Sequence, residues 1–153
     1  MQPFQYMLPQ RILCPIDFSD ASRAAMKMAG ELSKVGHAEI MLLHVFARPS
    51  VGADALSEVL LEKATARLAG DAVRRLEQWK RDAEALGAKI GKIFAFPGTP
   101  WEVIVKTAEN ESIQAIVMST HGRKGFQRAF LGSVAEKVVR YAPCSVFVVR
   151  PAG

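Results

Sequence analysis

The sequence contains few cysteines and no long apolar segment. Only Cys14 and Cys144 occur among its 153 residues, too few for the disulfide framework of a small secreted protein. No run approaches the roughly 18 consecutive apolar residues that a membrane-spanning helix needs. The N-terminus also lacks the charged region and apolar core of a secretory signal. We therefore expect a cytoplasmic protein with no membrane partner.

Concentrated charge and familiar catalytic motifs are also missing. The net charge of +5 suits an anionic ligand, but no block rich in lysine and arginine is present, so nucleic acid is not expected as a partner. The sequence has no phosphate loop ending in Gly-Lys-Ser/Thr, no His-Glu-x-x-His pair and no nucleophile elbow. It therefore predicts no catalytic residue and no metal-binding residue.

What the chain does contain is a regular alternation of short apolar runs and helical patterns. Strands are predicted over residues 11–17, 38–46, 89–96, 114–119 and 145–149, and helices over 21–35, 55–86, 100–110 and 133–141. Residues 1–10 carry two prolines and no periodic pattern, so they are expected to form an irregular arm. Such alternation predicts one α/β domain over residues 1–153, with a doubly wound five-stranded parallel sheet and helices on both faces. A Rossmann-like or flavodoxin-like fold with strand order 3-2-1-4-5 satisfies the right-handed crossover rule.

Several residues have local structural interpretations. Ser19, or alternatively Ser22, is predicted to cap the first helix, which Gly36 ends. Thr99 is predicted to cap the helix that begins at Pro100, with Glu102 completing a capping box.

Two further residues lie inside predicted strands. His44 is interpreted as a hydrogen-bonded residue of the core in preference to a catalyst. Gly91 weakens its strand, which we therefore place near a sheet edge.

The predicted topology brings two distant segments together. In the order 3-2-1-4-5, strands one and four are neighbours at the switch point, where open α/β sheets bind ligands beyond the carboxyl ends of the strands. Asp17 follows the first strand and therefore lies beside Met118 to Gly122. A cap or turn residue before the first helix is the alternative interpretation of Asp17.

The stretch from Ile116 to Ser133 has the pattern of a strand, a loop and a helix N-terminus. The loop carries Arg123, Lys124 and Arg128, and the first N–H groups of the following helix have no intrahelical partner. Together with the positive end of the helix dipole, these groups favour phosphate binding. The alternative is an ordinary loop followed by a helix that Ser133 caps.

The spacing within this stretch resembles the nucleotide motif of the universal stress protein superfamily. That motif is glycine, two residues, glycine, nine residues, glycine, then serine or threonine; here Ser119, Gly122 and Gly132-Ser133 occupy these places. The segments 12–19, 42–45 and 98–100 also match in order, so the resemblance covers nearly the whole chain.

The resemblance implies that the ligand is ATP, accompanied by Mg²⁺. In the ATP-binding members, the matching positions imply that Asp17 and the backbone near Pro15 lie at the ribose and adenosine end. Val45 packs or hydrogen-bonds near adenine through its backbone, and Met118 and Ser119 lie along the base and ribose.

The resemblance also assigns the phosphate contacts. Backbone N–H groups of Gly122, Gly132, Ser133 and Val134 bind the phosphates, and Ser133 adds its hydroxyl. Such members are usually homodimers in which the final strands pair. The strand 145–149 is apolar and lies at a sheet edge in the predicted order, where unpaired backbone groups invite a second strand.

Three functions remain open at this point. The first is an ATP-binding, nucleotide-dependent regulator or sensor in the stress response. The second is a dimeric stress-response interaction protein that binds no nucleotide, since Ser119 stands where the motif has its first glycine. The third is a weak ATP hydrolase, for which His121 is the nearby titratable residue and no catalytic constellation is evident.

Overall fold

The observed elements alternate between strand and helix along the whole chain. The computed structural model describes residues 8–50, 52, 55–120 and 131–152. In chain order the elements are β1 (Arg11–Pro15), α1 (Asp20–Gly36), β2 (Glu39–Phe46), α2 (Ala55–Ala85), β3 (Ile90–Pro97), α3 (Pro100–Asn110), β4 (Ala115–Ser119), α4 (Ser133–Tyr141) and β5 (Ser145–Val149). Each predicted element is present, and most bounds differ by only one or a few residues.

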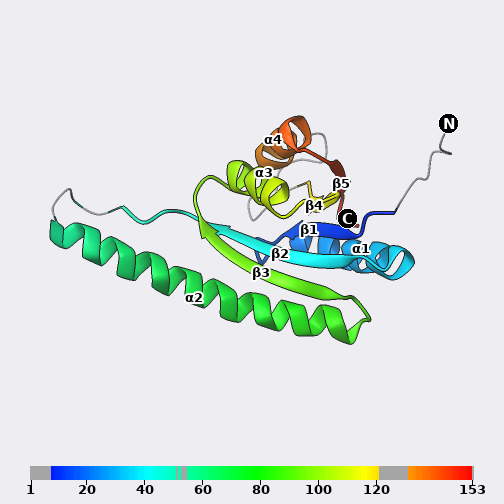
Figure 1. Ribbon diagram of the computed structural model, residues 1–153, viewed down its shortest axis with the longest axis horizontal. Helices are drawn as coiled ribbons and strands as arrows, with labels where there is room; N and C mark the ends of the chain where they lie inside the picture. Colours follow the sequence, from blue (N-terminus) through cyan, green and yellow to red (C-terminus); the bar gives the residue numbers. More distant parts are fainter. Residues whose placement is uncertain (1–7, 51, 53–54, 121–130, 153) are drawn as a thin grey trace.

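The strands form one parallel sheet in the order β3-β2-β1-β4-β5, which confirms the predicted topology (Figure 1). Strand β1 is central: Leu13 is paired with Met41 of β2 on one side and with Ile116 of β4 on the other. The chain moves outward from β1 to β2 and β3, and later returns to fill the opposite side with β4 and β5. The switch point therefore lies between β1 and β4.

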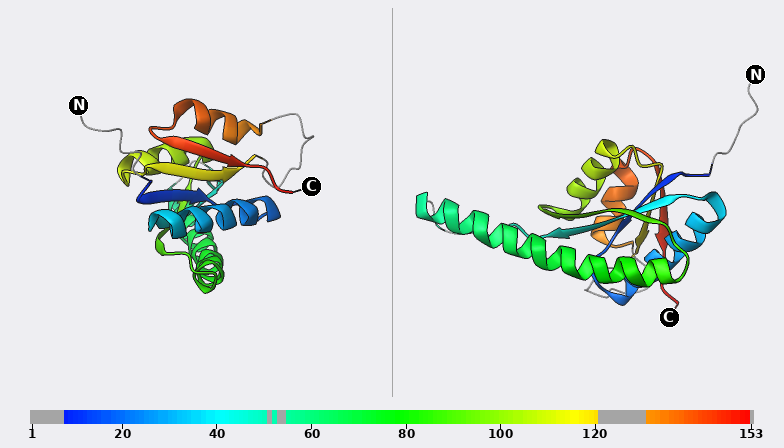
Figure 2. Two further views of the ribbon diagram at one scale, coloured as in Figure 1. Left: turned by 90° about the vertical axis from the view of Figure 1, so that its right-hand side faces the viewer. Right: turned by 60° about the horizontal axis from the view of Figure 1, so that its bottom comes forward.

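Helices cover both faces of the sheet, with α1 and α2 on one face and α3 and α4 on the other (Figures 1 and 2). Side chains alternate across a strand, so Ile12 and Cys14 enter the core under α1 and α2, while Leu13 enters the core under α3 and α4. Both cores are closed by fully buried aliphatic side chains, including Leu42, Leu76 and Val138.

The predicted capping residue of α1 is confirmed at its N-terminus but not at its C-terminus. Ser19 is the N-cap, and its side chain accepts a hydrogen bond from the Ser22 N–H, which confirms the preferred cap. At the other end, Gly36 is still helical, and His37 adopts the left-handed conformation with φ of 56°. Helix α1 therefore extends one residue beyond the predicted 35, and His37 takes the left-handed cap position that was expected for Gly36.

The turn before α3 depends on a glycine. Gly98 has φ of 142°, and a Cβ there would come within 2.9 Å of the Val103 side chain. Its N–H donates to the Phe46 carbonyl at 3.0 Å, which ties the turn to β2. Thr99 is the N-cap as predicted, but its side chain makes no cap hydrogen bond, so the expected side-chain capping interaction of Thr99 is not formed.

Helix α2 is continuous through Gly70 and runs well past the sheet (Figures 1 and 2). Its buried residues lie in the C-terminal half: Ala72, Leu76, Trp79 and Ala83. Four large apolar residues of the N-terminal half are exposed, namely Leu56, Val59, Leu60 and Leu68. Within the described chain, no helix combines the length and apolar character needed to cross a membrane.

Strand β3 is the edge strand on the α2 side, as Gly91 suggested. Its register against β2 shifts between the pairs Ile40–Ile90 and Leu42–Ile93, so β3 contains one extra residue there. Glycine tolerates the altered backbone of such a bulge and often marks it.

Candidate functional site

The predicted site residues converge on the carboxyl ends of β1 and β4. Continuing the register from Leu13 and Ile116 places Pro15, the last residue of β1, level with Met118 near the end of β4. Asp17 follows β1 directly. The topology thus brings the Asp17 turn and the end of β4 to the switch point of the sheet, where a ligand of an open α/β fold binds.

The Asp17 carboxylate is held by the first turn of α1. Its Oδ1 atom accepts hydrogen bonds from the Ser19 N–H at 3.0 Å, from the Ser22 hydroxyl at 2.5 Å and from the Ser19 hydroxyl. The Asp17 N–H in turn donates to the Ser22 Oγ at 3.0 Å. Asp17 therefore has the cap and turn role that was its alternative interpretation.

This arrangement also suits the carboxylate electrostatically. The positive end of the α1 dipole lies at Ser19 and stabilises a negative charge there. Ser22 is 2% exposed, so its hydroxyl has a fixed orientation. The local network therefore fixes the orientation of the Asp17 carboxylate at the switch point.

His44 has the structural role expected for it. Its Nδ1 donates to the Ile16 carbonyl at 2.7 Å, and its ring lies 4.5 Å from the Phe18 ring. The hydrogen bond ties β2 to the segment between Pro15 and Asp17. Val45, the next residue along β2, is half-buried and pairs with Phe96 of β3, so it extends past the carboxyl end of β1.

On the other side of the switch point, β4 ends in a buried hydrogen-bonded corner. Met118 is 5% exposed and Thr120 is 3% exposed. The Thr120 N–H donates to the Val149 carbonyl at 3.0 Å, and the Thr120 carbonyl accepts from the Gly132 N–H at 2.8 Å. Ser119 lies half-buried between Met118 and Thr120. Thr120 was not singled out in the sequence, because a single threonine in a polar loop carries no pattern.

The N-terminus of α4 follows immediately. Gly132 is the N-cap with φ of −59°, and Ser133 is the first helical residue, so Ser133 does not cap this helix. Because the Gly132 N–H is already bonded to Thr120, the phosphate donors expected here reduce to the N–H groups of Ser133 and Val134 and the Ser133 hydroxyl. These first helical N–H groups have no intrahelical acceptor.

The middle of the loop lies outside the described residues. This applies to Gly122 of the motif and to His121, Arg123, Lys124 and Arg128. Their predicted contributions, a backbone N–H and positive charge near the phosphates, stay predictions.

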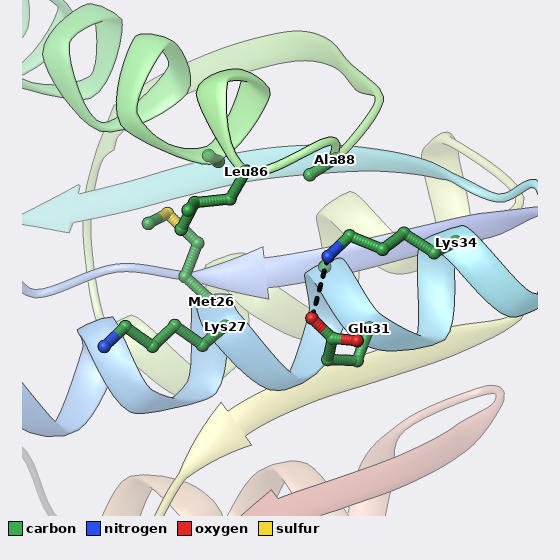
Figure 3. A pocket seen from close by; sticks show the side chains of 8 residues that line it. Met26, Lys27, Glu31, Lys34, Leu86 and Ala88 are labelled. Carbon is green, nitrogen blue, oxygen red and sulfur yellow. Dashed lines mark hydrogen bonds and ion pairs between the residues drawn. The ribbon is translucent and has the colours of Figure 1, made fainter.

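A shallow pocket among the described residues lies elsewhere, between α1 and the C-terminal end of α2 (Figure 3). Its floor includes Met26 and Ala88, and Lys27 and Lys34 stand at its rim, where Lys34 is paired with Glu31 at 2.9 Å. This location is at the amino end of the strands, away from the switch point. The pocket therefore has no part in the site described above.

Neither cysteine is suited to nucleophilic chemistry. Burial raises the pKa of the Cys14 thiol from 9.0 to about 12, and Cys14 is fully buried in β1. Burial also raises the pKa of Cys144, while a backbone hydrogen bond with Ile116 partly opposes that effect. Thiolates are the reactive form, so both residues are interpreted as small apolar side chains.

Metal ligands do not gather in the part of the chain that the structure describes. No group of three histidine, cysteine, aspartate or glutamate side chains there could hold an ion. A magnesium ion accompanying ATP fits this donor set only if the phosphates supply most of its ligands, which is a common arrangement for Mg²⁺.

The chain belongs to the universal stress protein family, whose family model, described as "Universal stress protein family", matches residues 9–150. It is 30% identical to the universal stress protein MJ0577 of Methanocaldococcus jannaschii, over 92% of this chain and 94% of that protein. A solved structure of MJ0577 superimposes with a TM-score of 0.81, covering 96% of this chain and 99% of that one at 30% identity.

Two more distant solved structures share the fold. A universal stress protein in complex with cAMP gives a TM-score of 0.72 at 21% identity, covering 95% of this chain and 99% of that one. A universal stress protein family protein of Arabidopsis thaliana with AMP bound gives 0.63 at 18% identity, covering 95% and 94%.

Proposed function

We propose that this chain binds ATP at the switch point between β1 and β4 and acts as a nucleotide-dependent regulator or sensor in the stress response. One observation carries the proposal: the preoriented Asp17 carboxylate and the N-terminus of α4 lie at the same edge of the sheet. The Asp17 carboxylate would accept a hydrogen bond from a ribose hydroxyl. The Ser133 and Val134 N–H groups and the Ser133 hydroxyl would bind phosphate oxygens.

The complexes of distant relatives with cAMP and AMP support the class of ligand. They show that this fold accommodates adenine nucleotides in those proteins. Val45 and Met118, which border the switch point, would contact the base, and the net charge of +5 favours an anionic ligand.

The proposal is tested by identifying what the purified protein carries. Protein prepared without added nucleotide is denatured, and the released small molecules are identified by mass spectrometry. We expect ATP or another adenine nucleotide. Protein that carries none and takes up none on incubation with ATP and Mg²⁺ would favour the non-nucleotide interaction protein. Release of ADP and phosphate over many turnovers would favour the hydrolase.

We also propose that the protein is a homodimer through β5. This strand is at the end of the sheet order, and Phe147 is 42% exposed. Antiparallel pairing with β5 of a second copy would satisfy the exposed backbone groups and close the assembly around a two-fold axis.

A further inference from the structure

The ring of Phe18, the residue after Asp17, contacts two aromatic rings from other parts of the fold. The Phe18 ring lies 4.5 Å from the His44 ring of β2 and 5.7 Å, edge to face, from the Trp79 ring of α2. Aromatic pairs at these separations are attractive beyond the area they bury. Phe18 is therefore anchored to β2 and to α2, although it belongs to the turn after β1.

Two arginines cover the outer faces of these rings. The Arg75 guanidinium lies 3.8 Å from the centre of the Phe18 ring, and the Arg23 guanidinium lies 4.3 Å from the centre of the Trp79 ring. Arg23 also pairs with Asp82 of α2 at 3.4 Å. These cation–π and ionic contacts fix the rings from the solvent side and connect α1 to α2.

The backbone of Phe18 explains why such anchoring is needed. Phe18 has φ of 65°, a left-handed conformation that a bulky residue rarely adopts. It stands between Asp17 and Ser19, and this reversal lets the Ser19 N–H reach back to the Asp17 carboxylate. A strained backbone conformation persists only where the surrounding structure holds it in place. The contacts of the Phe18 ring with its neighbours hold this one.

We propose that Phe18 is a positioning residue, whose ring contacts with His44, Trp79 and Arg75 hold the turn that orients Asp17 and link the nucleotide site to α2. The proposal rests on the proposed ATP binding for its effect on affinity, but its structural part is independent of any ligand. Without the ring, the turn would sample other conformations. The apparent affinity would then fall in proportion to the fraction of molecules that keep the competent turn.

Three variants of Phe18 distinguish the effect of its aromatic ring from the effect of its left-handed backbone conformation. Phe18→Ala removes the ring and keeps the left-handed strain, Phe18→Gly removes both, and Phe18→Tyr keeps an aromatic ring. We expect ATP affinity to fall about tenfold or more in Phe18→Ala, corresponding to a turn populated in about a tenth of the molecules. The ATP affinity of Phe18→Gly should fall less than that of Phe18→Ala, and the affinity of Phe18→Tyr should stay within about threefold of wild type.

A matched control removes a ring from another place. Phe94 of β3 stacks on Phe96 with ring centres 5.4 Å apart, and Phe94→Ala should lower stability without lowering ATP affinity to the same extent. If Phe94→Ala and Phe18→Ala weaken binding equally, the effect is general destabilisation and the proposal is wrong. A folded Phe18→Ala variant with wild-type affinity would overturn it as well.

The link to α2 has its own spectroscopic signature. In a Trp101→Phe background, Trp79 is the only tryptophan, because the chain has two. Its fluorescence should change when ATP binds, and Phe18→Ala should abolish the change even at saturating ATP. A fluorescence change that is unaltered at saturation in Phe18→Ala would contradict the proposed link.

Hydrogen exchange distinguishes failure of this inference from failure of ATP binding. In the protein without ligand, the Ser19 N–H donates to the Asp17 carboxylate, and the Ser22 N–H donates to the Ser19 hydroxyl. Both amides should exchange at least about tenfold faster in Phe18→Ala, while amides within β2 keep their wild-type rates. Unchanged exchange at Ser19 and Ser22 would overturn the positioning role, even if wild-type protein binds ATP; faster exchange supports it, even if no nucleotide binds.

Discussion

The Gly132 N–H donates a 2.8 Å hydrogen bond to the carbonyl of Thr120, and these two residues stand on either side of the loop that carries the nucleotide motif. Thr120 is itself bonded to Val149 of β5. The start of α4 is therefore fixed to the end of β4 and, through it, to the edge strand. Any phosphate held at α4 would lie at a fixed position relative to Asp17.

Replacing Asp17 tests whether its carboxylate contacts the ligand. Asp17→Ala should weaken ATP binding by about 1.5–3 kcal/mol, the range for hydrogen bonds to a charged group. It should also lower stability, because Oδ1 accepts three hydrogen bonds in the first turn of α1. Asp17→Asn is the matched control, since it keeps an oxygen acceptor and loses the charge. Binding is measured by calorimetry after circular dichroism has shown each variant to be folded; wild-type affinity in folded Asp17→Ala would leave Asp17 with a structural role alone.

Strand β5 gives a prediction about assembly. Val148→Pro removes a backbone donor from the edge strand and should shift the protein from dimer to monomer at micromolar concentration. Sedimentation velocity of wild type and variant measures this directly. Val148→Thr keeps the donor and should stay dimeric. A monomeric wild type, or a well-folded dimeric Val148→Pro variant, would place the interface elsewhere or exclude it.

The buried Cys14 thiol makes stability depend on alkaline pH. Its pKa of about 12 in the folded protein lies above the ordinary value of 9.0. The contribution of the protonated thiol to the free energy of unfolding is therefore complete below pH 9 and is lost as pH rises from 9 towards 12. The free energy of unfolding of wild type minus that of Cys14→Ala should fall by about 1.4 kcal/mol between pH 8 and pH 10. Urea titrations at the two values measure the difference. A difference independent of pH would show that the thiol is not desolvated.

Adding a side chain at Gly98 should lower the stability of the protein. Gly98→Ala would place a Cβ 2.9 Å from Val103 at a φ of 142°, and we expect a loss of about 1–3 kcal/mol in the free energy of unfolding. Gly52, whose nearest neighbour to an added Cβ is 3.6 Å away, provides the control, because Gly52→Ala should change stability little. Denaturant unfolding measures both; equal stabilities for the two variants would contradict the strain at Gly98.

Most of the fold could be predicted because local signals agree with one another. The α4 and β5 bounds were predicted to the residue, since Gly132 and Pro143 mark breaks around a clear helical pattern. The end of α1 was missed by one residue, because His37 takes a left-handed conformation usually left to glycine. The sequence also did not indicate that α2 is buried only in its C-terminal half. Its apolar pattern continues into the N-terminal half, over residues that no part of the described sheet covers.

The site could be predicted in outline but not in its internal bonding. Asp17 and Gly132 were identified from topology and spacing, yet no pattern indicates that the Gly132 N–H bonds to Thr120. The anchoring of Phe18 was missed for the same reason. Its partners His44, Arg75 and Trp79 lie on other elements, and such contacts exist only once the sheet and α2 have packed.

The measurement that tests the central claim most directly is calorimetric titration of ATP into wild type, Gly132→Ala and Gly132→Val. Because Gly132 has φ of −59°, ordinary residues can adopt its backbone, and both variants should fold. We expect micromolar-range affinity for wild type, weaker binding for Gly132→Ala, and no detectable binding for Gly132→Val, whose branched side chain would intrude where the phosphate approaches α4. A wild-type protein that binds no ATP, or a folded Gly132→Val variant that binds as tightly as wild type, would contradict the account.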